Sequence, residues 1–274
     1  MNNKNIDFSS RSRNVSLTKD KETFIPNGRA AGANAAIEWV RNSWEIVKQN
    51  LGNWILLLFL YLICFTIILL VPFINLIALF IAPVFMGGFM AICEEYRKKG
   101  SFNIGLFFHG FKKNFGSLLA VGIFTILILT VGVLAAIVIG SIGIYQFYLI
   151  GQGSEIDIAM VLLIFFIFIL TYIAIMFFSI LGLAYTWFAP ALIVINGLKF
   201  SDAISMSFNA VKKNLLGGFI FFLLMNMIIT LSIIPLGLGL FITIPIYLAA
   251  YYTSYRSIFY AESKESKESE ESEN

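Results

Sequence analysis

The chain alternates short half-polar segments with long apolar ones. In residues 37–50 the apolar side chains recur at spacings of three and four, at Ile37, Val40, Trp44 and Val47. This spacing places them in one stripe of a helix, which indicates an amphipathic helix at a membrane surface. The apolar stretch that follows, residues 51–93, is too long for one membrane crossing of roughly 20 residues and suits two. The pattern therefore predicts an interfacial helix followed by a transmembrane hairpin.

The same order of segments occurs three times, in repeats at about residues 37–96, 102–198 and 201–260. The second and third half-polar segments carry stripes of their own, with Phe107 and Phe111 in one and Ile204 and Val211 in the other. One hairpin alone buries little apolar surface, so stacked hairpins are expected. The sequence therefore predicts an all-α membrane protein with six transmembrane helices as three hairpins, each preceded by an amphipathic interfacial helix. Together these form a membrane domain at residues 34–261.

The second hairpin is longer than the others. Its apolar run at residues 158–195 would measure about 57 Å as a helix, which is nearly twice the thickness of a bilayer core. It forms either two spans or one long kinked helix. Two spans would place Lys199, Lys212 and Lys213 on the other side of the membrane, so one span is predicted.

Each half-polar segment ends at an asparagine, and an aromatic residue lies six positions before it. The asparagines are Asn50, Asn114 and Asn214, and the aromatic residues are Trp44, Phe108 and Phe208. Asparagine tolerates the left-handed conformation that ends helices, and its side chain can cap the next helix. We therefore predict a helix break at each asparagine, with the side chain as a cap worth roughly 0.5–2 kcal/mol.

Prolines mark the even-numbered spans, at Pro83, Pro190 and Pro245. Proline removes a backbone donor inside a helix and so favours a bend. Each of the three precedes a charged segment, and a bend in the cytoplasmic half of each span is predicted.

The two ends of the chain are polar. Residues 1–33 contain too few apolar side chains to offset the entropy of ordering, and they lack the pattern of a signal peptide, so a disordered tail is predicted. Residues 262–274 form an acidic run of Glu, Ser and Lys, which indicates a second disordered tail.

Basic residues lie on one side of the predicted spans. If the hairpin turns face one side, all 19 Lys and Arg lie on the other. The opposite loops, at residues 71–75, 139–157 and 235–240, carry only Glu155 and Asp157. The positive-inside rule then places both termini in the cytoplasm, with the basic residues near anionic lipid headgroups.

Residues that carry chemistry are scarce. No ionisable side chain lies in the middle of a predicted span, which argues against a coupled pump but leaves a pore of neutral groups such as Asn226 and Thr125 open. Cys64 and Cys93 are expected to be free buried thiols, and the single His109 is expected on the wet face of a surface helix. The sequence indicates no enzyme, no cofactor, no metal site and no nucleic-acid partner.

With these units in place, the chain resembles a family of uncharacterised bacterial multi-pass inner-membrane proteins. The resemblance rests on residues 44–50, on the steps Ala82-Pro83 and Ala189-Pro190, and on residues 107–111 before Asn114. The repeats are also similar to the membrane region joined to some glycerophosphodiester phosphodiesterases. This chain lacks room for the catalytic barrel of those enzymes, so the resemblance implies a fold and a bacterial inner-membrane location but no hydrolase activity.

Two functions remain open from the sequence. The first is a non-enzymatic envelope or membrane-organising factor that works through lipid and protein contacts. The alternative is a small transporter or channel for a neutral or lipid-like substrate. A polar cavity between the hairpins would favour transport, whereas a dry centre filled with aromatic side chains would favour the organising role.

Overall fold

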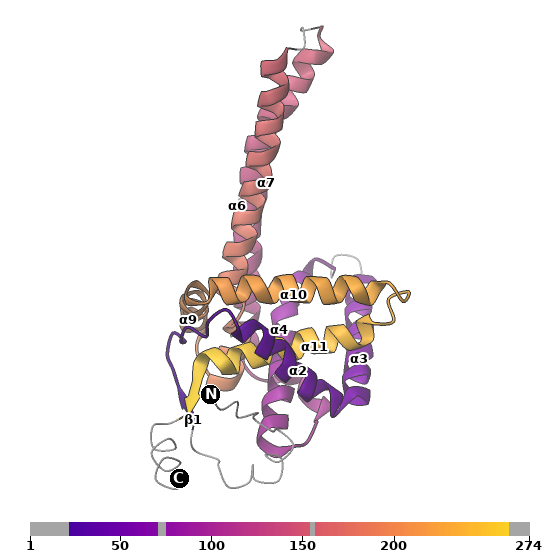
Figure 1. Ribbon diagram of the computed structural model, residues 1–274, viewed down its shortest axis with the longest axis vertical. Coiled ribbons are helices and arrows are strands. Elements are labelled where there is room, and N and C mark those ends of the chain that lie inside the picture. Colours follow the sequence, from indigo (N-terminus) through magenta and orange to yellow (C-terminus); the bar gives the residue numbers. More distant parts are fainter. Residues whose placement is uncertain (1–21, 71–74, 154–156, 263–274) are drawn as a thin grey trace, which may run out of the picture.

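The computed structural model describes residues 22–70, 75–153 and 157–262, which form a helical body with one long projecting hairpin (Figure 1). The elements in chain order are β1 (Glu22–Phe24), α2 (Ala35–Lys48), α3 (Leu51–Leu70), α4 (Asn75–Lys99), η1 (Ile104–Phe108), α5 (His109–Lys112), α6 (Phe115–Gly151), α7 (Ile158–Thr186), α8 (Ala189–Asn196), α9 (Phe200–Lys213), α10 (Leu215–Ile233), α11 (Leu240–Phe259) and β2 (Tyr260–Glu262). The prediction of an all-α protein is confirmed, with a single two-stranded sheet added to it.

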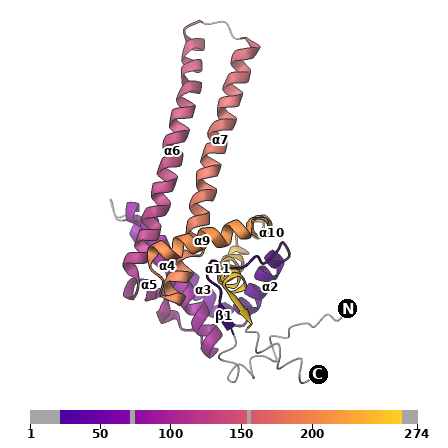
Figure 2. The same cartoon turned by 90° about the vertical axis from the view of Figure 1, so that its left-hand side faces the viewer.

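Helices α6 and α7 form an antiparallel pair that rises well beyond the body in both views (Figures 1 and 2). With 37 residues, α6 is about 55 Å long at 1.5 Å per residue. The run at residues 158–195 was predicted to be one span kinked at Pro190, whereas the structure divides it into two helices. Helix α7 ends at Thr186, and α8 begins two residues later at Ala189, with Pro190 in its first turn, where proline is tolerated.

The α10–α11 hairpin takes a direction that the sequence does not predict. It runs across the axis of the α6–α7 pair, as both views show (Figures 1 and 2). Within the described residues, four helical runs are long and apolar enough to cross a membrane, namely Leu51–Leu70, Phe115–Gly151, Ile158–Asn196 and Leu215–Ile233. Membrane embedding is therefore supported, but the six spans and their arrangement as three hairpins are not confirmed.

The two other prolines lie inside continuous helices. Pro83 is within α4 and Pro245 within α11. The chain is interrupted at residues 187–188, just before Pro190, and a bend at Pro83 and Pro245 stays a prediction.

The core lies where α11 packs against α2, α3, α4 and α10. Aromatic rings fill much of it, with the ring centroid of Trp187 4.3 Å from that of Tyr251 and 6.0 Å from that of Phe221. Ala249, Ala250 and the residues from Tyr251 to Tyr255 are buried. Small and aromatic side chains at this crossing let the helices approach closely and still exclude water.

Glycine permits the closest backbone contacts of α4. A Cβ atom on Gly88 would lie 2.0 Å from the carbonyl oxygen of Phe107, and one on Gly122 of α6 would lie 2.2 Å from that of Phe80. Gly110 approaches the carbonyl oxygen of Val84 in the same way, at 2.3 Å. Three glycines therefore fix η1, α5 and α6 against one helix.

The N-terminal region is ordered at residues 22–33, whereas the sequence predicts disorder up to residue 33. Residues 22–33, here called the strap, contain β1, which pairs antiparallel with β2. Beyond β1, the backbone N–H of Ile25 donates to the carbonyl of Phe259 at 2.8 Å, and that of Arg29 donates to Ile258 at 2.9 Å. The prediction of disorder up to residue 33 is therefore wrong for residues 22–33, because backbone pairing with the end of α11 and packing of Phe24 on Phe259 and Tyr260 hold the strap. Residues 1–21 and 263–274 lie outside the described residues.

Candidate functional site

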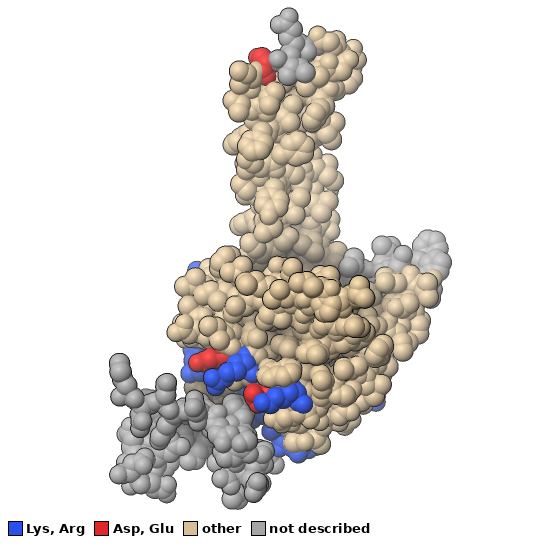
Figure 3. All heavy atoms as spheres, turned by 45° about the vertical axis from the view of Figure 1, so that its right-hand side comes forward, with Lys and Arg blue, Asp and Glu red and all other residues tan. Residues whose placement is uncertain are grey.

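The α6–α7 pair exposes apolar side chains on all sides. Val138 is 68% exposed and Phe165 63%, and no Lys or Arg occurs between residues 114 and 198. Figure 3 shows the same contrast, with basic side chains on the body and only an acidic one near the tip of the projecting pair. Side chains of this kind are stable in lipid rather than in water.

The base of the pair is held by aromatic contacts. The ring of Phe124 in α6 lies 5.6 Å from that of Tyr185 in α7 and 5.8 Å from that of Phe200 in α9. Beyond Phe124 we call the rest of the pair the arm, made of residues 125–151 and 158–182. At its tip, Asp157 caps α7 by accepting a hydrogen bond from the backbone N–H of Met160 at 2.7 Å.

Two hollows bear on the choice between transport and membrane organisation. The hollow inside the body measures about 50 Å³ and is lined mainly by aromatic rings, including Trp39, Trp187 and Phe221. A second hollow, of about 370 Å³, is a shallow groove on the arm between Ile137, Ile144 and Ile175. The first has room for only a few water molecules, and the second faces outward with apolar walls.

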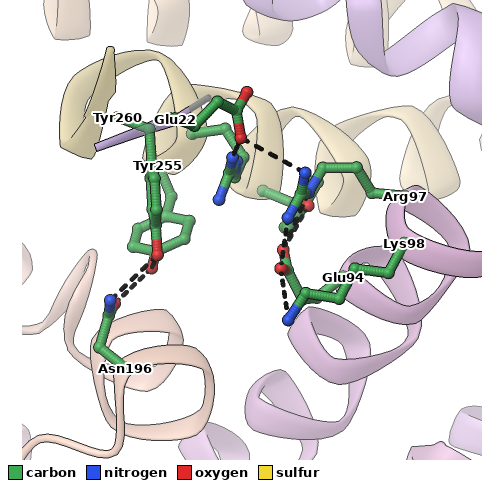
Figure 4. A network of polar contacts seen from close by, with 9 residues as sticks. Glu22, Glu94, Arg97, Lys98, Asn196, Tyr255 and Tyr260 are labelled. Atoms are coloured by element: carbon green, nitrogen blue, oxygen red, sulfur yellow. Dashed lines mark hydrogen bonds and ion pairs between the residues drawn. The ribbon is translucent and has the colours of Figure 1, made fainter. Parts of the chain in front are cut away.

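A charged network joins the ends of α4 and α11 to the strap (Figure 4). The carboxylate of Glu94 accepts hydrogen bonds from Arg97 at 2.8 Å and from the hydroxyl of Tyr252 at 2.7 Å, and it pairs with Lys98 at 3.1 Å. Glu94 is only 7% exposed. Burial alone would raise the pKa of Glu94, but the hydrogen bonds from Arg97 and Tyr252 outweigh it and lower that pKa below its ordinary value. The carboxylate is therefore ionised at neutral pH.

The second half of the network surrounds Tyr255. Its hydroxyl donates to the side-chain oxygen of Asn196 at 2.5 Å, and the amide nitrogen of Asn196 donates to the hydroxyl of Tyr260 at 3.0 Å. The guanidinium of Arg256 stacks 3.6 Å above the ring of Tyr260 and pairs with Glu22. These contacts connect α8, α11 and β1 at one end of the body.

The predicted breaks at the three asparagines are present, but the asparagines act differently. Asn114 has a left-handed backbone with φ of 63°, and Asn50 and Asn214 also lie between two helices. Neither Asn114 nor Asn214 caps the following helix with its side chain, so the capping prediction is wrong for both. The amide of Asn114 donates to the carbonyl of Ile193 at 3.1 Å and thereby ties α6 to α8.

Asn214 anchors the strap instead. Its side-chain oxygen accepts from the backbone N–H of Ala31 at 2.7 Å, and its amide donates to the carbonyls of Arg29 at 2.9 Å and Ala210 at 2.8 Å. The contacts with Ala31 and Arg29 span more than 180 residues of chain, so no local pattern in the sequence indicates them.

The aromatic residues before the asparagines do not gather at one place. Trp44 is 39% exposed and Phe108 is 38% exposed, whereas the ring of Phe208 stacks on that of Tyr185 with centroids 4.4 Å apart. His109 is partly exposed, and partial burial together with Lys113 and Lys112 lowers its pKa. Cys64 and Cys93 are free thiols, as predicted, but only Cys93 is buried and Cys64 is partly exposed.

Replacing Asn214 with Ala should destabilise the protein by roughly 1–3 kcal/mol, because it leaves buried backbone groups of the strap without partners. Asn50→Ala is the matched control, since Asn50 is also a residue between two helices and makes no side-chain hydrogen bond in the described part of the chain. Thermal unfolding in detergent and amide exchange at Ala31 measure the two effects. Equal losses of stability in the two variants would show that each asparagine contributes only to the helix break and that Asn214 does not anchor the strap.

Comparison of the chain with protein families, with curated proteins and with solved structures found no match.

Proposed function

We propose that this protein is a non-enzymatic membrane-organising factor of the bacterial inner membrane, anchored by the arm and oriented by its charged body. The observation that carries the proposal is an arm with apolar side chains on all sides, joined to a body that holds the basic residues. Such a shape offers lipid and other membrane helices a large contact surface. The resemblance to inner-membrane proteins supports the same location.

The length of the arm supports a complete crossing of the bilayer. Residues 125–151 number 27, which corresponds to about 40 Å of helix. A bilayer with its headgroup regions is about 40–45 Å thick. Tyr145 and Tyr148 then lie near the far headgroups, where aromatic side chains with a polar end are favoured.

The interior of the body supports organisation over transport. The hollow among Trp39, Trp187 and Phe221 is dry in character and too small for a solute path. No specific observation favours the transporter, so it becomes an outcome of the test.

The test uses the full chain in liposomes of matched composition, with protein-free liposomes as the control. We expect a change in acyl-chain order, measured by deuterium NMR, and release of a trapped neutral solute such as glycerol at the protein-free rate. Faster release of glycerol would support the transporter. Unchanged acyl-chain order at high protein content would contradict the organising role.

The orientation of the protein in the membrane can be tested separately by cysteine labelling. With Cys64 and Cys93 replaced by Ser, a cysteine at Gln152 should react with an impermeant maleimide added to intact spheroplasts. A cysteine at Ser101, in the charged segment after α4, should react only after lysis. This follows from the basic residues on the body side of the arm. Labelling of position 152 only after lysis would invert the topology.

A further inference from the structure

Two arginines from different helices meet at one carboxylate of the strap. Arg97, near the end of α4, and Arg256, near the end of α11, both donate to the same oxygen of Glu22, with Arg97 Nη1 at 3.3 Å (Figure 4). Arg97 also pairs with Glu94. In the described part of the chain, Glu22 is the acidic group that pairs with Arg256.

The arginine and the carboxylate differ in their exposure. The side chain of Arg256 is 11% exposed, whereas that of Glu22 is 46% exposed. Burial lowers the pKa of Arg256 to about 10, so its guanidinium remains charged at neutral pH. A buried cation without an anion is costly, so this position requires a negative charge. The carboxylate that supplies it is presented from a three-residue strand.

The geometry around Arg256 is suited to an anion with several acceptor oxygens. The face of the guanidinium is covered by the ring of Tyr260, which leaves its N–H edge for an acceptor. Arg97 approaches the same point and is 39% exposed, so the position can be reached from solvent. Paired guanidinium groups match the geometry of phosphate and carboxylate and bind them through charge-assisted hydrogen bonds.

We propose that Arg97 and Arg256 form a phosphate-binding site and that Glu22 of the strap occupies it as an internal competitor. The phosphate group belongs to an anionic lipid headgroup or to a free phosphate. The site does not depend on the organising function, because it stands on the arginine pair and the strap alone.

Occupation of the site by phosphate is coupled to loosening of β1 at the start of the strap. Once phosphate replaces Glu22, β1 loses its side-chain ion pairs, while its pairing with β2, the backbone bonds of Ile25 and Arg29 and the anchoring of Arg29 and Ala31 by Asn214 remain. The site therefore converts binding of an anion into a change in the stability of the β1–β2 pairing.

The first test compares the full-length protein with its Glu22→Gln variant in neutral detergent. Binding is measured by calorimetry, with inorganic phosphate in one series and short-chain phosphatidylglycerol in the other, against phosphatidylcholine as the baseline. Removal of the competitor should tighten phosphate binding about tenfold, as expected if the wild-type site is open about a tenth of the time. Glu45→Gln is the matched control, because it removes a surface ion pair with Lys48 that is remote from the strap in sequence.

The two series identify the source of the phosphate. Binding of inorganic phosphate indicates a free phosphate ligand, and binding of phosphatidylglycerol alone indicates a lipid headgroup. Adding Arg256→Gln to the Glu22→Gln variant should abolish either response. Equal affinities of wild type and Glu22→Gln, or binding that survives Arg256→Gln, would overturn the proposal.

Amide exchange of the wild-type protein provides a test that needs no variant. Saturating ligand should speed exchange at Ile25 and Arg29, whose N–H groups bond to α11. Bound ligand with unchanged exchange at both positions would show that the strap does not compete for the site.

Discussion

Gly88→Ala should destabilise the protein by about 1–3 kcal/mol, the usual cost of inserting a methyl group into a packed interior. The new Cβ would lie 2.0 Å from the carbonyl oxygen of Phe107 and 2.7 Å from its carbonyl carbon. These are backbone atoms, so α4 and η1 must move apart to make room. The expected gain in helix propensity from Gly to Ala, about 1 kcal/mol, is smaller than this loss.

The neighbouring residue provides a matched control. A Cβ on Gly87 would meet methyl groups of Leu118 and Val194 at 3.0 Å, and these are the ends of side chains that can shift. Gly116, in α6, has nothing within 4 Å of such a Cβ and sets the baseline. Thermal unfolding in detergent should rank Gly116→Ala as most stable, then Gly87→Ala, then Gly88→Ala. If Gly88→Ala were as stable as Gly87→Ala, the close contact between α4 and η1 would be wrong.

The sequence predicts those features of the fold that depend on local patterns. Apolar stripes at spacings of three and four predicted α2 and α9, and the length of the apolar run predicted a second hairpin longer than the rest. The helix breaks at Asn50, Asn114 and Asn214 were also predicted from spacing. In each case the physical cause lies within a few turns of one helix.

The features that the sequence did not predict depend on contacts between distant segments. The crossing direction of α10–α11 is set by packing against α2 and by rings such as Trp187 and Phe221, which have no signature in a hydropathy pattern. The strap is too polar to predict as ordered, yet Asn214 and the end of α11 hold it. Its Gly28 has a positive φ of 65°, and a Cβ there would approach Ile258 to 2.6 Å. A glycine in a polar segment gives no indication of which partner it will touch.

The charged network shows the same difference between local and distant contacts. The run from Glu94 to Lys99 is visible in the sequence as the polar end of α4, and its i,i+3 and i,i+4 ion pairs can be expected from helix geometry. Its contact with Tyr252 cannot, because the two residues are 158 positions apart. In the sequence, these charges were interpreted only as a signal of membrane orientation. In the structure, one of them, the carboxylate of Glu94, is buried and hydrogen-bonded.

Glu94→Ala should destabilise the protein by roughly 2–3 kcal/mol, because it leaves the buried hydroxyl of Tyr252 and the guanidinium of Arg97 without their shared acceptor. The loss stays below that of a fully buried ion pair, since Arg97 and Lys98 can turn towards solvent. Glu95→Ala is the matched control one residue along. Glu95 pairs with the largely exposed Lys99, and its loss should cost less than about 1 kcal/mol.

The role of Glu94 can also be tested through the pH dependence of the unfolding free energy. Hydrogen bonds keep the pKa of folded Glu94 below the value in the unfolded chain, so the unfolded state binds the proton first. The stability that Glu94 contributes is therefore complete above its ordinary pKa of about 4.3 and is lost as the pH falls through the lower folded value. The difference in unfolding free energy between wild type and Glu94→Gln, measured in detergent from pH 7 to pH 3, should be constant down to about pH 5 and shrink below about pH 4. A difference that grew on acidification would mean that burial outweighs the hydrogen bonds from Arg97 and Tyr252, with the carboxyl group protonated in the folded protein.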